Sequence, residues 1–319
     1  MTVGPMGRHV DDLVAVMRTL LQRPLFQLDE TIPPIIFNEE AYSSLNKPSL
    51  IVGFYDTSCH PELAQTVPSV RRAIATATRI MKSQGHQTIR FNPPRMLDAF
   101  SLCLKAMDID GGKTMLKMLK DEPETEFTKT LKQSLSVPAV LSRLASRVIK
   151  RKFRGPAEMT AYAQGTLHSA ELQELLFQIK AYRKEFDMAW IDADNFDVLI
   201  CPVWATPAFT RGTSIFYTSP LAVYCLLYNL LDYPAGVVPM GTVTAADVRE
   251  ASILTEEFKT SGDAFHEKVM QLQCDTEGLP LSVQIVARPF REELVLRVMK
   301  QLESGLESAL ATASGGDKL

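Results

Sequence analysis

The chain of 319 residues lacks any uninterrupted apolar run of the roughly 18 residues that a membrane-spanning helix needs. The stretch before the first expected helix is also poor in apolar residues, because it carries Arg8, His9, Asp11 and Asp12 where a signal peptide has its apolar core. We therefore expect a cytoplasmic protein that meets a membrane, if at all, peripherally from one side of an intracellular bilayer.

Cysteine is scarce and scattered, and the sequence contains no C-x-x-C pair. An odd number of separated cysteines argues against a disulfide framework and favours reduced thiols. Cys59 and His60 are the only adjoining cysteine and histidine, and no second pair stands at ligand spacing to complete a metal site. We therefore expect no metal and no other cofactor.

An excess of basic charge is missing too, because the formal net charge is -3. No global positive field attracts nucleic acid, so we expect no nucleic-acid partner. The composition is that of a globular protein with enough apolar material for a sizeable core, at 46% hydrophobic and 22% charged residues.

Strand and helix patterns alternate along much of the chain, which predicts an α/β fold with a sheet covered by helices. Expected strands lie at 49–56, 88–91, 196–203, 235–244 and 281–287, and the clearest helices at 9–21, 69–84, 171–190 and 292–310. The order strand, helix, strand over 49–91 predicts a parallel crossover unit. The region from about 94 to 190 is expected to be helical.

Four segments resemble the amidase signature family, in the same order as in that family. They are Thr2–Leu13, Phe196–Phe209 (FDVLICPVWATPAF), Tyr224–Gly241 (YCLLYNLLDYPAGVVPMG) and Gly278–Leu296 (GLPLSVQIVARPFREELVL). Strings such as GFYDTS, VPSVRRAI and PFREELVLR are most similar to the fatty acid amide hydrolases within that family. The resemblance implies the C-terminal portion of the amidase signature fold, a twisted mixed β-sheet covered by helices. It also implies hydrolysis of fatty acid amides to fatty acid and amine.

The catalytic segment of that family is absent from this sequence. The resemblance implies a nucleophilic serine, a second serine and a neutral lysine, with both serines in a Gly-Gly-Ser-Ser-Gly-like run, because serine needs an adjacent base to be activated. No such run occurs, and the only tandem serines, Ser43 and Ser44, have no flanking glycine. We therefore assign no catalytic residue and expect a truncated form that is inactive alone, beginning just after the position of the signature.

Two other interpretations of this absence stay open. The chain is an active amidase whose upstream half is missing from this sequence, or it is a non-catalytic lipid-binding or regulatory relative that keeps the acyl channel. A Gly-Gly-Ser-Ser-Gly run encoded in frame upstream of Met1 identifies the former, and saturable binding of a fatty acid without turnover identifies the latter.

The resemblance also implies the residues that line an acyl channel for a fatty acid amide or a fatty acid. These positions are mostly small or apolar, as a binding tunnel requires, and comprise Met107, Leu131, Ser219, Ala222, Leu226 and Phe265. Plain core packing is an equally good explanation of each. Asp108 is acidic where the family has an apolar ring, which weakens the match around Met107.

A helical segment at about 131–165 corresponds to the family's membrane cap. Its apolar side chains Val140, Leu141 and Leu144 fall on one helical face, with basic residues beside them, namely Arg143, Arg147 and Lys150. This pattern is typical of a helix that lies in a membrane interface, where basic residues are attracted to anionic lipid. A charged helix packed on its own domain explains it nearly as well.

These expectations define one partial amidase domain at 1–310, followed by a disordered tail at 311–319. A partial sheet leaves strand edges and apolar helix faces uncovered. We therefore expect instability, aggregation or pairing, either as a homodimer or with a complementing N-terminal half.

Overall fold

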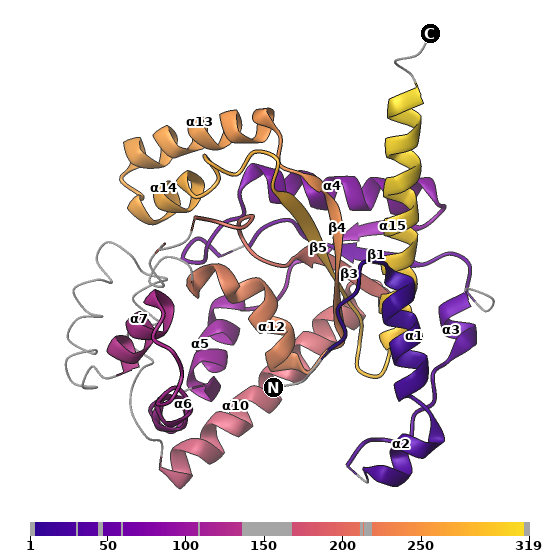
Figure 1. The fold of residues 1–319 in the computed structure, drawn as a ribbon, viewed down its shortest axis with the longest axis horizontal. Helices are drawn as coiled ribbons and strands as arrows, with labels where there is room; N and C mark the ends of the chain where they lie inside the picture. The colour runs from indigo at the N-terminus through magenta and orange to yellow at the C-terminus, as the bar shows by residue number, and fades with distance from the viewer. Residues whose placement is uncertain are drawn as a thin grey trace.

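A five-stranded mixed sheet forms the centre of the computed structural model, which describes residues 4–29, 31–43, 47–58, 60–107, 109–135, 168–210, 213 and 219–315 (Figure 1). The strands are β1 (Ile51–Phe54), β2 (Gln87–Arg90), β3 (Val198–Pro202), β4 (Ala235–Thr242) and β5 (Pro280–Val286). Their order in the sheet is β2-β1-β3-β5-β4. The predicted α/β class and each of the predicted strands are therefore confirmed, with strand ends shifted by a few residues.

The first part of the sheet is parallel and the second part is antiparallel. β1 pairs in parallel with β2 on one side and with β3 on the other. β5 is antiparallel to both β3 and β4. Helix α4 (Pro68–Ser83) connects β1 to β2, so the predicted parallel crossover unit is confirmed.

Helix α4 forms where its sequence combines a good start with a continuous apolar face. Pro68 occupies the first turn, where its missing N–H costs no hydrogen bond. Val70, Ile74, Ala77 and Met81 recur at helical spacing and are buried against the sheet. The helix ends just before Gly85, which adopts a positive φ of 87° that L residues with a side chain rarely take.

The other helices surround the sheet. They are α1 (Val10–Leu20), α2 (Arg23–Leu28), α3 (Glu39–Ser43), α5 (Met96–Met107), α6 (Lys113–Met118), α7 (Glu126–Leu135), α10 (Ser169–Asp192), the 3-10 helix η1 (Ser219–Ala222), α12 (Val223–Leu231), α13 (Ala245–Ser261), α14 (Ala264–Gln271) and α15 (Glu292–Gly315). Helix α15 continues through Ala311 to Gly315, whereas the sequence predicted an unstructured tail from 311. The alanines at 309, 311 and 313 favour the helix and extend it.

The two faces of the sheet carry different cores. We call the face covered by α1, α4 and α15 the aliphatic face, because its sheet side chains are branched aliphatic residues such as Val52, Ile200, Val283 and Ile285. We call the face covered by α5, α10 and α12 the aromatic face, because tyrosine, phenylalanine and Trp190 dominate its core. Figure 1 shows these two groups of helices on opposite sides of the strands.

Helix α15 approaches β4 closely on the aliphatic face. A Cβ added to Gly236 would collide with the Met299 sulfur and come within 3.0 Å of Val295 Cγ1. Glycine at this position therefore lets the helix lie directly on the strand backbone.

Candidate functional site at the carboxyl ends of the parallel strands

The loops that follow β1 and β3 lie at the same edge of the sheet, because the two strands are parallel. Ligands of open α/β sheets commonly bind beyond the carboxyl ends of the strands. Here this edge is formed by Tyr55 and the loop after it, by Cys201 and Pro202 at the end of β3, and by the adjoining helix α12. Buried hydroxyl and thiol side chains lie at this edge.

Buried hydroxyl and thiol groups form a connected cluster at this edge, which we call the tyrosine cluster (Tyr55, Cys201, Tyr224, Tyr228 and Gln284). The Tyr55 and Tyr228 hydroxyl oxygens are 2.9 Å apart. The Gln284 side-chain amide donates to the Cys201 sulfur at 3.4 Å and to the Tyr224 carbonyl at 3.4 Å. The β-strands and α12 are thus joined by polar contacts inside an otherwise apolar core.

The Tyr224 hydroxyl fixes the loop after β1. It donates to the Ala64 carbonyl at 2.7 Å and accepts from the Ser58 backbone N–H at 2.9 Å. Both ends of this loop are therefore held by one side chain from α12, which satisfies two buried backbone groups.

Burial keeps the tyrosine cluster in its neutral form. It raises the pKa of the Cys201 thiol to about 11, and it raises the pKa values of Tyr55 and Tyr228 well above the usual tyrosine range. Desolvation disfavours the thiolate and the phenolates, so none of these groups is a nucleophile or a general base near neutral pH. The cluster supports the site structurally.

Three of the residues predicted for the acyl channel lie on this side of the sheet. Leu226 is half-buried on α12, and its carbonyl accepts a hydrogen bond from the Cys103 thiol of α5 at 3.3 Å. Ala222 lies one turn earlier and is buried. Phe265 is buried on α14 within the same aromatic core against which Leu226 packs. Leu226 and Phe265 therefore belong to the same extended core, whereas no direct contact between α12 and α14 is part of this observation.

The other predicted channel residues lie apart from this group. Met107 ends α5 with 60% of its surface exposed, so within this chain it is not enclosed. Leu131 is half-buried on α7. Ser219 is the first residue of η1, and its side chain lies outside the part that the structure describes. Asp108 lies outside it as well.

His266, next to Phe265, is a site residue that the sequence analysis missed. Its ring is 2% exposed, with Nδ1 2.8 Å from Asp263 Oδ2 and Nε2 3.1 Å from the Leu63 carbonyl. This histidine therefore ties α14 to the loop after β1 and holds Phe265 beside it. The local signal was Asp263 three residues before His266, where the aspartate caps the helix N-terminus.

Ser43, one of the tandem serines of the sequence, and Ser58, in the loop after β1, make ordinary helix and loop contacts. Ser43 Oγ lies 3.5 Å from the Glu40 carbonyl at the end of α3, and Ser44 lies outside the described residues. Ser58 Oγ accepts from the His60 backbone N–H at 3.1 Å. These contacts match a structural role and supply no base that would activate the hydroxyl.

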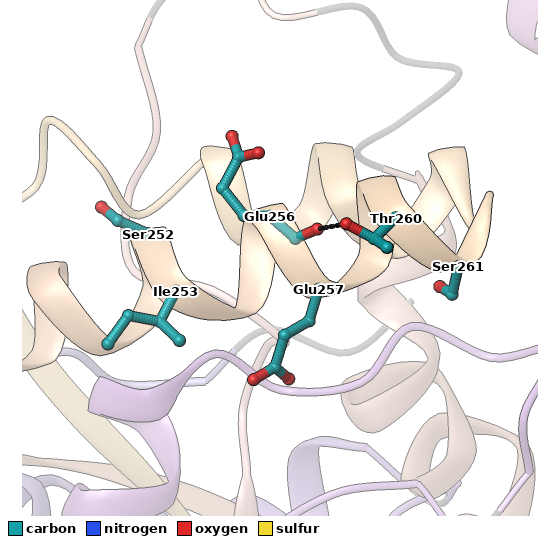
Figure 2. A pocket seen from close by; sticks show the side chains of 6 residues that line it. All are labelled: Ser252, Ile253, Glu256, Glu257, Thr260 and Ser261. Atoms are coloured by element: carbon teal, nitrogen blue, oxygen red, sulfur yellow. Dashed lines mark hydrogen bonds between the residues drawn. The ribbon is translucent and has the colours of Figure 1, made fainter.

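A shallow hollow lies elsewhere, on the outer side of α13 (Figure 2). It is lined by Ser252, Ile253, Glu256, Glu257, Thr260 and Ser261, all from this one helix. The Thr260 hydroxyl donates to the Glu256 carbonyl at 2.8 Å, and the Ser261 hydroxyl donates to the Phe258 carbonyl at 2.9 Å. The hollow contains none of the predicted channel residues.

The predictions on membrane contact and metal binding can be compared only with the residues that the structure describes. All of the predicted membrane-contact residues lie outside it, namely Val140, Leu141, Arg143, Leu144, Arg147 and Lys150. Within the described ranges, no helix has both the length and the apolar character to cross a bilayer. Across the same ranges, no three His, Cys, Asp or Glu side chains gather as a metal-binding group.

Comparison with known proteins shows the family of this chain. The amidase family model matches residues 1–296, and the chain belongs to the amidase family. Fatty-acid amide hydrolase 1 of Sus scrofa is 34% identical over 306 residues, which cover 95% of this chain and 50% of that protein. Fatty acid amide hydrolase 1 of Caenorhabditis elegans is 34% identical over 307 residues, covering 94% of this chain and 50% of that protein.

Solved structures share the fold. A fatty acid amide hydrolase superposes with a TM-score of 0.66 at 20% identity, covering 95% of this chain and 48% of that chain. A 6-aminohexanoate cyclic dimer hydrolase complexed with substrate gives 0.55 at 17% identity, covering 94% and 54%. The chain spans about half the length of the curated relatives it matches.

Proposed function

We propose that this chain is the C-terminal half of a fatty-acid-amide-hydrolase-like serine amidase, which hydrolyses fatty acid amides to fatty acid and amine. The observation that carries the proposal is the 34% identity to two fatty acid amide hydrolases across 95% and 94% of the chain. Fatty acid amides are therefore the proposed substrate class, and fatty acids the proposed product ligands.

We further propose that the 319 residues are inactive by themselves. Amide hydrolysis by serine needs a nucleophile, a base and donors for the oxyanion in one constellation. The sequence contains no Gly-Gly-Ser-Ser-Gly run to provide them, and the tyrosine cluster is held neutral by burial. A separate segment therefore has to supply the catalytic serines and lysine.

In this proposal the chain contributes an apolar wall for the acyl group. Ala222, Leu226 and Phe265 are the proposed middle of this wall, which is supported by the burial of Ala222 and by the position of Leu226 and Phe265 in one core. Ser219 lies at the start of η1, and Met107 and Leu131 lie on the neighbouring helices α5 and α7. Contact with an anionic membrane through the basic segment at 137–154 is part of the same proposal.

Purified chain incubated with a long-chain fatty acid amide tests the catalytic statement. We expect no release of fatty acid above the uncatalysed rate, and no acyl adduct on any serine by mass spectrometry. Turnover at an enzyme-like rate, or a site-specific adduct that is lost on denaturation, would contradict the proposal.

The acyl wall is tested separately by titration with a fluorescent fatty acid. Leu226→Asp should weaken binding about tenfold or more, because it places a charge in the apolar wall. Ile253→Asp is the matched control, since Ile253 is 61% exposed on the outer side of α13. Equal affinities for the two variants, with both folded by circular dichroism, would remove α12 from the ligand site.

A further inference from the structure

His86 is a buried histidine that the candidate functional site does not use. It lies between the turn at Gly85 and the first residue of β2, and only 6% of its surface is exposed. The Leu50 backbone N–H donates to His86 Nδ1 at 3.1 Å, and the Leu50 carbonyl accepts from the Gln87 N–H at 2.9 Å. Both backbone groups of Leu50, one residue before β1, are therefore bound at the start of β2.

The hydrogen bond from Leu50 defines the charge of the His86 ring. A backbone N–H can only donate, so Nδ1 is an acceptor and carries no proton. The ring is therefore neutral, with its one proton on Nε2, which has no hydrogen-bond partner of ordinary geometry among the described residues. A second proton would have to bind to Nδ1, where it would face the Leu50 N–H. Protonation of His86 therefore removes this hydrogen bond.

Helix α15 brings a permanent positive charge to the same place. Arg297 is 4% exposed, and its Nη2 donates to the Lys47 carbonyl at 2.7 Å and to the Pro48 carbonyl at 3.2 Å. Its guanidinium stays charged at every pH at which proteins are folded. Arg297 thus fastens α15 to the segment that leads into β1. A protonated His86 would add a second cation to this poorly solvated region.

Two charged groups act on the His86 ring, and they act in opposite directions. Burial lowers the pKa of His86 most, and the Arg297 charge lowers it further, whereas the Gln301 side chain and the Asp197 carboxylate raise it. The Asp197 carboxylate is itself bound by Lys47 Nζ at 2.6 Å and by the Ile51 N–H at 2.9 Å. The lowering effects outweigh the raising effects, so the pKa of His86 lies below its ordinary 6.5.

We propose that His86 is an acid-sensitive joint between the entry of β1, the start of β2 and helix α15. The neutral ring holds Leu50 and lies beside Arg297 without repulsion. The protonated ring releases the Leu50 N–H and repels Arg297, so that α15 loosens from the segment before β1. The groups of this joint are buried within the chain's own residues, so the inference does not depend on amide hydrolysis or on a second polypeptide.

The sign of the pH dependence follows from the lowered pKa. The stabilisation by neutral His86 is complete above the ordinary value of 6.5 and is lost as pH falls from there through the lowered pKa. In that interval the unfolded chain binds a proton that the folded chain does not bind. The equilibrium constant for folding should therefore fall by up to about tenfold for each unit of pH.

NMR titration of the histidine ring protons, from about pH 5 to 8, tests the charge of the joint. The midpoint for His86 should lie below that for His168, which is exposed at the start of α10. Arg297→Met removes the neighbouring charge but keeps an apolar chain, so it should raise the His86 midpoint. A His86 midpoint at or above that of His168 in the wild-type protein would overturn the proposal.

Urea unfolding over the same pH range tests the effect on stability. His86→Asn keeps an acceptor for the Leu50 N–H near the position of Nδ1 but cannot be protonated. Its stability should therefore fall less in acid than that of the wild type. His168→Asn is the matched control, since it removes an exposed histidine and should reproduce the wild-type pH profile. Parallel profiles for the wild type and His86→Asn would contradict the joint.

Amide hydrogen exchange, corrected for the intrinsic effect of pH, locates the release. The Leu50 amide should lose protection in acid in the wild type and keep it in His86→Asn. The Val243 amide, which donates to the Leu279 carbonyl at the other end of the sheet, should stay protected in both. Unchanged protection of Leu50 in acid would overturn the proposal. Equal losses at Leu50 and Val243 would overturn it too, because they indicate global unfolding in place of local release.

Discussion

The aromatic and aliphatic faces of the sheet contrast in both packing and chemistry. The aliphatic face is built mainly from valine, isoleucine, leucine and methionine, and Phe37 is the one aromatic residue among its buried members in the described part of the chain. The aromatic face contains four buried tyrosines of α10 and α12 or their ends, in addition to Tyr55 and Trp190, with polar contacts between them. Leu226 and Phe265, two of the residues predicted for the acyl channel, belong to the core of that second face.

The two faces therefore stabilise the fold in different ways. Aliphatic side chains on one face need only shape and volume to pack. Tyrosines on the other face need partners for their hydroxyls as well, which fixes the loops at the carboxyl ends of β1 and β3. Substitutions on the two faces should therefore differ in size and in pH dependence.

The largest expected effect is at the centre of the aromatic face. Trp190 is fully buried, its ring centroid lies 4.0 Å from that of Phe196, and its Nε1 donates to the Phe196 carbonyl at 2.6 Å. Trp190→Ala should lower the free energy of unfolding by about 3–5 kcal/mol. Leu302→Ala, fully buried on the aliphatic face, should cost about 3 kcal/mol. Urea unfolding of both variants measures the contrast, and a larger loss for Leu302 would reverse it.

The second-largest loss in the free energy of unfolding should come from removing a charged contact beside the aliphatic face. Arg72 of α4 donates to Asp247 at 2.7 Å, and Thr244 donates to the same carboxylate through its N–H at 2.7 Å. Asp247→Asn should lower the free energy of unfolding at neutral pH by about 2–3 kcal/mol, because it removes charge-assisted hydrogen bonds. Asp98→Asn, at an exposed ion pair with Arg95, serves as the control and should lose less.

The same contact predicts the direction of the pH dependence. Burial of Asp247 raises its pKa, but hydrogen bonds from Arg72 and Thr244 outweigh burial and lower the pKa below its ordinary 3.8. The stabilisation is therefore complete above that ordinary value and is lost as pH falls through the lowered pKa. The difference between wild type and Asp247→Asn should shrink in acid, and a difference that grows there would contradict the argument.

A smaller effect should follow from the close approach of α15 to β4. Gly236→Ala places a Cβ against the Met299 sulfur and should cost about 1.5 kcal/mol through overpacking. Met299→Ala alone leaves a cavity and also destabilises. The double variant should lose less than the sum of the two, because the smaller side chain makes room for the added methyl. Strict additivity in thermal or urea unfolding would show that the two positions do not press on each other.

The smallest single effects should come from the hydroxyls of the tyrosine cluster. Tyr55→Phe and Tyr228→Phe should each cost about 1 kcal/mol, because each leaves a buried partner hydroxyl with fewer hydrogen bonds. The double variant should cost less than the sum, since no hydroxyl is then left alone. A fully additive cycle would mean that the 2.9 Å contact contributes no coupling.

Alkaline pH sharpens this last test. Burial raises the pKa values of both tyrosines above their ordinary 10.0. The stabilisation of the folded state by these two neutral hydroxyls is therefore present below about pH 10. It is lost as pH rises toward the raised pKa values, since the tyrosines of the unfolded chain ionise first. The double phenylalanine variant should lose less stability than wild type on this alkaline limb.

Local patterns in the sequence predicted most of the strands and the long helices. The apolar run at 196–203 and the helical spacing in 69–84 are properties of short segments, so β3 and α4 followed from them. The family resemblance implied a mixed sheet, which the antiparallel pairing of β5 confirms, but no local pattern specified which strands become neighbours. The four family-like segments predicted the fold class, which the strand order bears out.

Less of the candidate site than of the fold could be predicted from the sequence. Tyr55 and Tyr228 are separated by 173 positions, and neither stands in a pattern that announces a hydrogen bond. His266 reaches Leu63 across 203 positions for the same reason. Ala222, Leu226 and Phe265 came from the family resemblance alone, and no local pattern specified that Leu226 and Phe265 share one core.

The central pairing of β1 with β3 has a consequence for how the protein is made. Ile51 donates to Asp197 Oδ2 at 2.9 Å, although the two residues are 146 positions apart. At the usual rate of translation, β3 emerges from the ribosome roughly 7–30 s after β1. We expect β1 and β2 to form a nascent two-stranded ribbon during that interval, in which the side of β1 that later pairs with β3 is unpaired. Chaperone binding to this ribbon, followed by a slow folding phase after release, is the expected biosynthetic signature of such distant strand pairing.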